Sequence, residues 1–315
     1  MVPVSVDLSY DNEQVTLQRS IDGFCHRCGT SPEFAQTDPL PTDFWLGLGD
    51  LGVLGLGTDI GGGGVLEISA AMETLGYHGA PGPLVGTFAA TALLDADRTD
   101  ELVSGTALAS VGGHQLYPWA PKASVIIELD NEGAWLVEPD GDMEEYETTG
   151  GEPWGRGAVI RTKRLGSAEL AVARAAVAAA AYVVGAAHAL VELSTEYARN
   201  RVQFNKPIAT FQAVSHPLAA AATRLNGSRI LVRSAAQRLD RGADDALSSA
   251  AIAKMSAIAS GTEAAYRAHQ LFGAMGFTLE GPIAFRSHRI RQVGLLVPNQ
   301  RQLRTVVAGG LNLSN

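Results

Sequence analysis

The sequence predicts a mostly helical α+β protein in which an N-terminal helical domain, a small β middle domain and a C-terminal four-helix bundle follow one another. Three observations support this prediction. Apolar residues recur at helical spacing over the first hundred residues, short β-rich runs alternate with turns over the next sixty, and long Ala-rich helical patterns fill the remainder. We therefore place the domains at residues 1–104, 105–166 and 167–315.

The N-terminal domain is predicted to be entirely helical. Helices are expected over residues 10–24, 42–55, 65–76, 84–94 and 97–104. Thr42 or Asp43 is a suitable N-cap for the second of these helices, since short polar side chains accept hydrogen bonds from the free backbone N–H groups of a first turn. The Ala-Pro-Gly-Pro run at residues 80–83 separates the third helix from the fourth.

The middle domain is predicted to contain short strands and no long helix. Strands are expected over residues 124–128, 134–137 and 159–161, with a turn at residues 130–133. A segment of this size cannot bury enough surface alone, so we expect it to pack against its neighbours.

The C-terminal domain is predicted to be a bundle of long helices. These are expected over residues 169–199, from residue 214 onward, and over residues 247–270 and 300–308. Pro217 is tolerated in a first turn, whereas Asn226-Gly227 marks a possible break. Alanine-rich surfaces let helices approach closely, which is typical of four-helix bundles.

Charge and hydropathy exclude several classes of function. The net charge of −9 and the pI near 5.3 argue against nucleic acid as a partner, because phosphate binding needs clustered lysine and arginine. Residues 170–193 are the nearest approach to a membrane span, but they are mostly alanine and contain charged residues, so no membrane partner is expected. The N-terminus lacks the features of a signal peptide, and the expected location is the cytoplasm.

The only cysteines, Cys25 and Cys28, lie in a Cys-His-Arg-Cys run. This spacing is found in redox pairs and in half of a zinc site. The sequence holds no second CxxC or HxxxH motif to complete four zinc ligands, so two ordinary thiols and no metal site are predicted.

Two polar segments between the Ala-rich helices carry a resemblance to a known family. The first elbow, residues 199–212, reads Arg-Asn-Arg-Val-Gln-Phe-Asn-Lys-Pro-Ile-Ala-Thr-Phe-Gln, and the second elbow, residues 269–277, reads His-Gln-Leu-Phe-Gly-Ala-Met-Gly-Phe. Together with the Leu/Gly-rich run 44–56, the glycines 61–64 and the Glu-Thr-Leu-Gly end at 73–76, they resemble the acyl-CoA dehydrogenase family over most of the chain. The resemblance implies FAD as cofactor, an acyl-CoA substrate and an electron-transfer flavoprotein as electron acceptor.

The resemblance implies a set of flavin-contacting residues in the two elbows. These are Arg201, Gln203, Phe204, Gln212, Gln270, Gly273 and Ala274. An arginine suits the pyrophosphate, the glutamine amides suit ribityl and adenine edges, and an aromatic ring suits the flavin face. The glycine and alanine let the backbone approach an anion closely. In the family these positions of one subunit reach FAD held mainly by the neighbouring subunit, so a dimer is the expected working unit.

The sequence departs from the family where the catalytic base is expected. Most members carry a glutamate before a Gly-Thr or Gly-Ser in the loop preceding the last helix, and here that place falls near Val297, beside Leu295 and Leu296. Other members carry the base early in the first bundle helix, where residues 171–178 offer only Arg174 as an ionisable group, with Glu169 lying upstream. We therefore assign no catalytic residue in this chain.

The middle domain also lacks the family motifs that hold FAD from the same subunit, namely Thr-Glu-Pro, Gly-Ser-Asp and Lys-x-x-Ile-Thr-Asn. The chain thus resembles the base-lacking subunit of short actinobacterial α2β2 enzymes that act on sterol side-chain CoA thioesters. Two alternatives stay open. In the first alternative, the chain is a self-sufficient homodimeric enzyme with a displaced base, such as Glu263 or Glu280. In the second, it is a non-catalytic scaffold that binds acyl-CoA.

Overall fold

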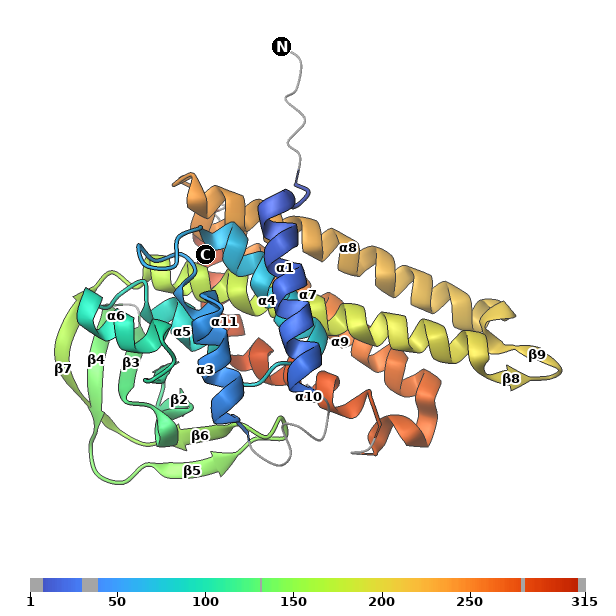
Figure 1. Cartoon of the computed structure of the whole chain (residues 1–315), viewed down its shortest axis with the longest axis horizontal. Helices are drawn as coiled ribbons and strands as arrows, with labels where there is room; N and C mark the ends of the chain where they lie inside the picture. Colours follow the sequence, from blue (N-terminus) through green and yellow to red (C-terminus); the bar gives the residue numbers. More distant parts are fainter. Residues whose placement is uncertain (1–7, 30–38, 131, 279–280, 311–315) are drawn as a thin grey trace, which may run out of the picture.

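The computed structural model describes residues 8–29, 39–130, 132–278 and 281–310. In these residues, an N-terminal set of helices and a β domain pack against a bundle of long helices (Figure 1). This order confirms the predicted fold class.

The N-terminal helices are α1 (Asn12–Cys28), α3 (Thr42–Asp50), α4 (Val65–His78), α5 (Leu84–Ala90) and α6 (Ala96–Val103). The helix predicted over residues 42–55 begins at Thr42 as expected, but its predicted N-cap, Thr42 or Asp43, and its predicted end were wrong. The N-cap is Pro41, and the helix stops at Asp50 because Gly52 adopts a left-handed conformation with φ 73° before a short 3-10 helix. The predicted helix 84–94 likewise ends early, at Ala90.

The middle domain contains two sheets. One has the order β1-β3-β4-β7 and the other β2-β6-β5. Their bounds are Ala109–Gly112 (β1), Leu116–Pro118 (β2), Val125–Asp130 (β3), Gly133–Pro139 (β4), Glu144–Glu147 (β5), Pro153–Arg156 (β6) and Val159–Gly166 (β7). Strands β3, β4 and β7 confirm the predicted runs. The other four were missed because they are short and lack apolar alternation; β5, for example, is exposed at every position.

The bundle is built around α7 (Glu169–Asn200), with α8 (Gln212–Asp240), α9 (Ala246–Phe272) and α10 (Ala284–Leu295) packed on it, while α11 (Gln300–Gly310) packs on α9. The predicted fourth helix of the bundle is α11, whereas the helix that packs on α7 together with α8 and α9 is α10, which the sequence did not indicate. Helix α10 is rich in basic residues, and one of them, Arg289, is buried. The break expected at Asn226-Gly227 is absent, since α8 continues through both residues.

Helix α7 is long and apolar enough, by length and composition alone, to cross a membrane, so the prediction that this segment is too weakly apolar was wrong. Its apolar stretch is 83% buried inside the protein, as in the core helix of a soluble domain. Small residues explain the burial. A Cβ on Gly185 would lie 1.8 Å from the Glu73 carbonyl oxygen, and one on Gly76 would lie 2.0 Å from that of Tyr182. Helices α4 and α7 therefore meet backbone to backbone.

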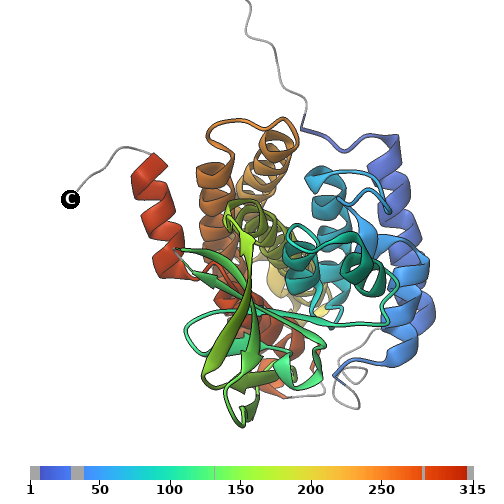
Figure 2. The same ribbon diagram turned by 90° about the vertical axis from the view of Figure 1, so that its left-hand side faces the viewer.

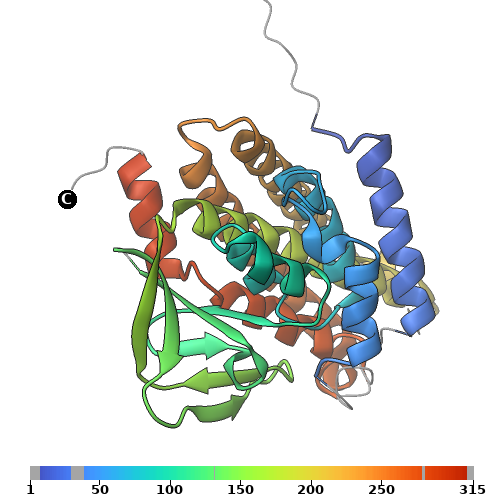
Figure 3. The ribbon, with the colours of Figure 1, turned by 60° about the vertical axis from the view of Figure 1, so that its left-hand side comes forward.

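The β domain, the N-terminal helices and α11 lie on different sides of the bundle that surrounds α7. The β domain covers one end of the bundle, the N-terminal helices lie along one side of it, and α11 lies on the opposite side (Figures 2 and 3). The far end of α7 extends beyond these layers and ends in the hairpin formed by β8 (Val202–Gln203) and β9 (Lys206–Pro207) (Figure 1). The fold thus has one covered end and one projecting end.

Candidate functional site

The first elbow folds as a small hairpin at the projecting end of the bundle. Strands β8 (Val202–Gln203) and β9 (Lys206–Pro207) pair antiparallel, and a 3-10 helix, Ile208–Thr210, leads into α8. The two turn residues between the strands, Phe204 and Asn205, have φ values of 53° and 62°, as in the tight turns that favour asparagine and glycine. Phe204 is consequently held at the tip, where it is 86% exposed and contacts the ring of Phe211 at 6.0 Å between centroids.

The second elbow lies at the same end of the molecule. The ring of Tyr197, in the last turn of α7, stacks on the ring of Phe272, the last residue of α9, at 4.3 Å between centroids. This contact joins the ends from which the two elbows begin. The chain after Phe272 forms a 3-10 helix, Gly273–Phe277, in which the Phe277 side chain is 73% exposed.

The seven residues predicted to contact flavin are therefore brought to one end of the bundle, and all of them are exposed. Their polar side chains make no hydrogen bond or ion pair with the residues that the structure describes. One detail differs from expectation, because the Gly273 N–H already donates to the His269 carbonyl and closes α9. Gly273 contributes open space instead, since no heavy atom would lie within 4 Å of a Cβ placed there.

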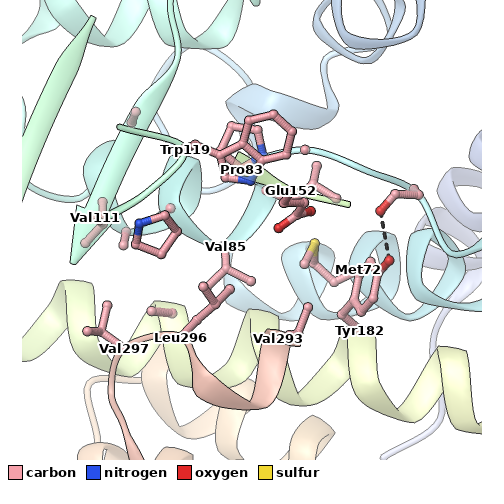
Figure 4. A pocket seen from close by; sticks show the side chains of 18 of the residues that line it. Met72, Pro83, Val85, Val111, Trp119, Glu152, Tyr182, Val293, Leu296 and Val297 are labelled. Carbon is pink, nitrogen blue, oxygen red and sulfur yellow. Dashed lines mark hydrogen bonds between the residues drawn. The ribbon is translucent and has the colours of Figure 1, made fainter. Parts of the chain in front are cut away.

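A separate, partly enclosed cavity lies where the N-terminal helices, the sheets and the bundle meet (Figure 4). This junction cavity has mostly apolar walls drawn from α4, α5, the first strands of the β domain, α7 and the α10–α11 loop. The space open to the centre of a water-sized sphere is about 20 Å³, which is room for one water molecule. Tyr182 closes one side by donating from its hydroxyl to the Ala80 carbonyl at 2.8 Å (Figure 4).

Glu152 is the carboxylate that lines the junction cavity, and sequence reasoning missed it. Arg289 Nη1 donates to its Oε1 and Gln292 Nε2 donates to its Oε2, so both oxygens are engaged. Thr148 in turn donates to Gln292 Oε1 at 2.8 Å. Burial lowers the pKa of Arg289 to about 9, although the carboxylate beside it favours the charged form. No local sequence pattern links Glu152 to Arg289, because the two residues of this ion pair are 137 positions apart in the chain.

The positions where the family base is expected, residues 295–297, carry only apolar side chains. Leu296 and Val297 line the junction cavity, whereas the Leu295 side chain is 68% exposed. Below the loop, the buried Lys254 donates from Nζ to the Leu296 and Pro298 carbonyls at 2.6 and 3.0 Å. Burial lowers the pKa of Lys254 to about 7.

The other candidate bases are equally unsuited. Glu263 lies on α9 and accepts from Arg267 Nε at 2.8 Å, with Arg224 Nη1 at 3.5 Å, and it faces a surface groove remote from the junction cavity. Glu280 lies outside the described residues. Glu169 is exposed in the first turn of α7. Arg174, the other ionisable residue near the start of this helix, has a pKa that burial lowers, but it is not a carboxylate.

Neither Cys25 nor Cys28 takes part in a disulfide bond with the residues that the structure describes. Cys25 is buried, and Cys28 is half-buried with a pKa that burial raises. A raised thiol pKa opposes thiolate formation, so nothing in this geometry activates the pair for redox chemistry.

Comparison with known proteins agrees with this geometry. Residues 164–294 match the family described as acyl-CoA dehydrogenase, C-terminal domain, a stretch that contains the bundle from α7 to α10 and both elbows. A 3-(aryl)acrylate reductase of Clostridium sporogenes is 34% identical over 142 residues, which are 45% of this chain and 37% of that protein. The acyl-CoA dehydrogenase IpdE2 of Mycolicibacterium smegmatis is 28% identical over 261 residues, which are 78% of this chain and 79% of that protein.

The fold is shared more widely than the sequence. A chain of the ChsE4-ChsE5 complex from Mycobacterium tuberculosis superposes on this chain with a TM-score of 0.82 at 21% sequence identity. The superposition covers 98% of this chain and 100% of that chain. The matched C-terminal domain, the α–β–α order of the domains and the two elbows point the same way. Residues 164–294 therefore form an acyl-CoA dehydrogenase C-terminal domain, and the chain as a whole has the fold of the acyl-CoA dehydrogenases.

Proposed function

We propose that this chain is a subunit of an FAD-dependent acyl-CoA dehydrogenase, which removes hydrogen from the α and β carbons of an acyl-CoA thioester. In this proposal it supplies FAD contacts to a site whose catalytic glutamate belongs to a second, unlike subunit. One observation carries the proposal. The predicted flavin contacts are exposed together at the projecting end of the bundle, far along α7 from a junction cavity whose one carboxylate is already engaged.

The exposed end suits FAD held by a neighbouring subunit. Arg201 presents a guanidinium that can bind a pyrophosphate through two N–H groups, and the glutamines offer free amides. Phe204 offers an aromatic face that its own chain leaves uncovered, and covering that face with a partner or a flat ligand removes apolar surface from water. When bound, FAD accepts the hydride that leaves the β carbon.

Proton removal from the α carbon needs a free carboxylate within hydrogen-bond reach. Within the described residues of the junction cavity, Glu152 is held on both oxygens, and the side chains of Leu296 and Val297 have no atom that accepts a proton. The narrow junction cavity also has no room for an acyl chain in this conformation. Both features favour a partner subunit that provides the base and the acyl pocket.

The finer assignments follow the same reasoning. We propose an α2β2 assembly, a sterol side-chain CoA thioester as substrate, an electron-transfer flavoprotein as acceptor and a cytoplasmic location. The similarity to IpdE2 and to a chain of the ChsE4-ChsE5 complex supports this short actinobacterial type. The ChsE4-ChsE5 structure is itself a complex, which fits an assembly of unlike subunits.

The test is the flavin absorbance of the full chain, purified alone and after co-expression with a second acyl-CoA dehydrogenase subunit that carries the catalytic glutamate. We expect little flavin in the chain alone, and a yellow complex that oxidises acyl-CoA after co-expression. A chain that is yellow and active alone would establish the self-sufficient homodimer instead. A complex that stays colourless would establish a non-catalytic scaffold.

A matched pair of variants sharpens this test. Arg201→Ala removes a charged donor at the projecting end, and Arg241→Ala removes an equally exposed arginine at the opposite end of α8. Hydrogen bonds to charged groups contribute about 1.5–3 kcal/mol, so Arg201→Ala is expected to weaken FAD binding by the complex by about 10- to 100-fold. Arg241→Ala is expected to bind FAD like the unmodified complex. Equal affinity in both variants would remove Arg201 from the site.

A further inference from the structure

A cluster of three potential metal ligands lies in the N-terminal domain, away from both elbows and the junction cavity. Asp22 and His26 occupy adjacent turns of α1, and His78 is the last residue of α4. One ligand atom from each lies within 4.8 Å of the other two. We propose that Asp22, His26 and His78 bind a divalent transition-metal ion, with Zn²⁺ as the expected occupant.

The distances suit three ligands of one small ion. Asp22 Oδ1 lies 2.8 Å from His78 Nε2 and 3.7 Å from His26 Nε2. Ligand atoms bound tetrahedrally to Zn²⁺ at about 2.0–2.1 Å are separated from one another by roughly 3.3 Å. The two observed separations bracket this value, so small side-chain rotations bring the three atoms to metal-binding geometry.

The ligand types select the class of metal. Two imidazoles and one carboxylate are typical of sites for zinc and neighbouring first-row ions, whereas Mg²⁺ and Ca²⁺ prefer sets made of oxygen alone. Three protein ligands leave a fourth position for water. The His26 side chain is 72% exposed and the Asp22 side chain 50% exposed, which gives an ion from solvent direct access to the cluster.

The surrounding backbone also favours a cation. His26 lies in the last turn of α1 and His78 in the last turn of α4, and both helices close on a left-handed glycine, Gly29 and Gly79. The last turns of two helices therefore direct the negative ends of their dipoles toward one spot. The neighbouring cation Arg286 is turned to backbone oxygens, since it donates to the carbonyls of Tyr77 and Pro282 at 3.1 and 3.3 Å.

The buried ligand anchors the site. His78 is only 6% exposed, with its Nε2 directed at Asp22, and the His26 ring lies edge-on to it at 5.0 Å between centroids. Elsewhere α1 is tied to α4 near its N-terminus, where Gln14 donates to Glu67 at 2.8 Å and Gln18 to the Ala70 carbonyl at 3.3 Å. A metal at the Asp22–His26–His78 cluster clamps the other end of this helix pair.

The experiment uses the full chain, stripped with a chelator and titrated with Zn²⁺ against a chromophoric competitor. We expect one Zn²⁺ per chain and a Tm that rises with Zn²⁺ concentration. With Co²⁺ in its place, we expect the visible absorption of a four-coordinate ion without an intense thiolate band. His26→Ala is the informative variant, because its exposed side chain can be removed without opening the core.

Removal of a ligand should lower Zn²⁺ affinity by at least about tenfold, because loss of an outer partner alone costs that much. His188→Ala is the matched control, since His188 lies 3.4 Å from Glu192 in the same i,i+4 relation on a helix, without a buried third ligand. It is expected to bind Zn²⁺ normally, as is Cys28→Ser. The proposal is overturned if the unmodified chain binds no Zn²⁺, if His26→Ala binds as tightly, or if either control loses the ion.

Discussion

The buried Lys254 predicts an unusual dependence of stability on pH. Its Nζ is enclosed between α9 and the loop where the family base is expected, and it donates to two carbonyls of that loop. We expect Lys254→Met, which keeps the length of the side chain and removes its charge, to change the slope of stability against pH. The variant also leaves the Leu296 and Pro298 carbonyls unpaired, which shifts the whole curve by a constant amount.

The magnitude follows from the pKa. Burial lowers the pKa of Lys254 from 10.5 to about 7, a difference of about 3.5 pH units, which at about 1.4 kcal/mol per unit is about 5 kcal/mol. Below pH 7 the amine is charged in both states, and the full cost of burying the charge is present. Between the two pKa values the unfolded chain binds more protons than the folded chain, so stability rises with pH. From pH 7 to pH 9 the gain is about 2–3 kcal/mol.

The assay is urea unfolding at pH 6, 7, 8 and 9 and at one protein concentration, for the unmodified protein and for Lys254→Met. Above pH 7, the free energy of unfolding of the unmodified protein should rise relative to that of the Lys254→Met variant. Lys163→Met, at a side chain that is 62% exposed, is the control and should follow the unmodified curve. Parallel curves for the unmodified protein and Lys254→Met would refute the reasoning.

Three further predictions concern packing and exposure. Glu152→Ala leaves the Arg289 charge buried without its partner and should cost about 3–5 kcal/mol in urea unfolding. Gly185→Ala places a Cβ against the α4 backbone and should cost about 1–3 kcal/mol or more, whereas Gly227→Ala on α8, with nothing within 4 Å, should stabilise by up to about 1 kcal/mol. Phe204→Ala should leave the Tm of the lone chain unchanged, because the side chain is 86% exposed, but should reduce the flavin retained by the complex.

Each of these outcomes has a clear opposite. A cost below about 1 kcal/mol for Glu152→Ala would mean that the charge on Arg289 finds water. Equal effects at Gly185 and Gly227 would mean that α4 and α7 are not in backbone contact. A lower Tm for Phe204→Ala in the lone chain would place the ring inside the protein rather than at a surface for a partner.

The sequence by itself determined the long helices, the three-part order and the chemistry of the two elbows. Periodicity is a property of neighbouring residues, so the Ala-rich pattern of α7 and the polar break after it are readable without coordinates. The absence of a base at Leu295–Val297 is equally legible, because it depends only on residue identity. Strands β2 and β6 and helix α10 were not predicted, because their short or basic sequences show no clear hydrophobic periodicity.

Only the tertiary structure decided which of these residues meet. The stacking of Tyr197 on Phe272 brings the two elbows to one end of the bundle. The pairing of Glu152 with Arg289 removes the one carboxylate of the junction cavity from proton chemistry. The packing of α4 on α1 brings His78 to Asp22 and His26, and the Cys25–Cys28 spacing did not indicate this cluster. Each contact joins residues far apart in the chain, and such contacts are set by how helices pack rather than by any local pattern.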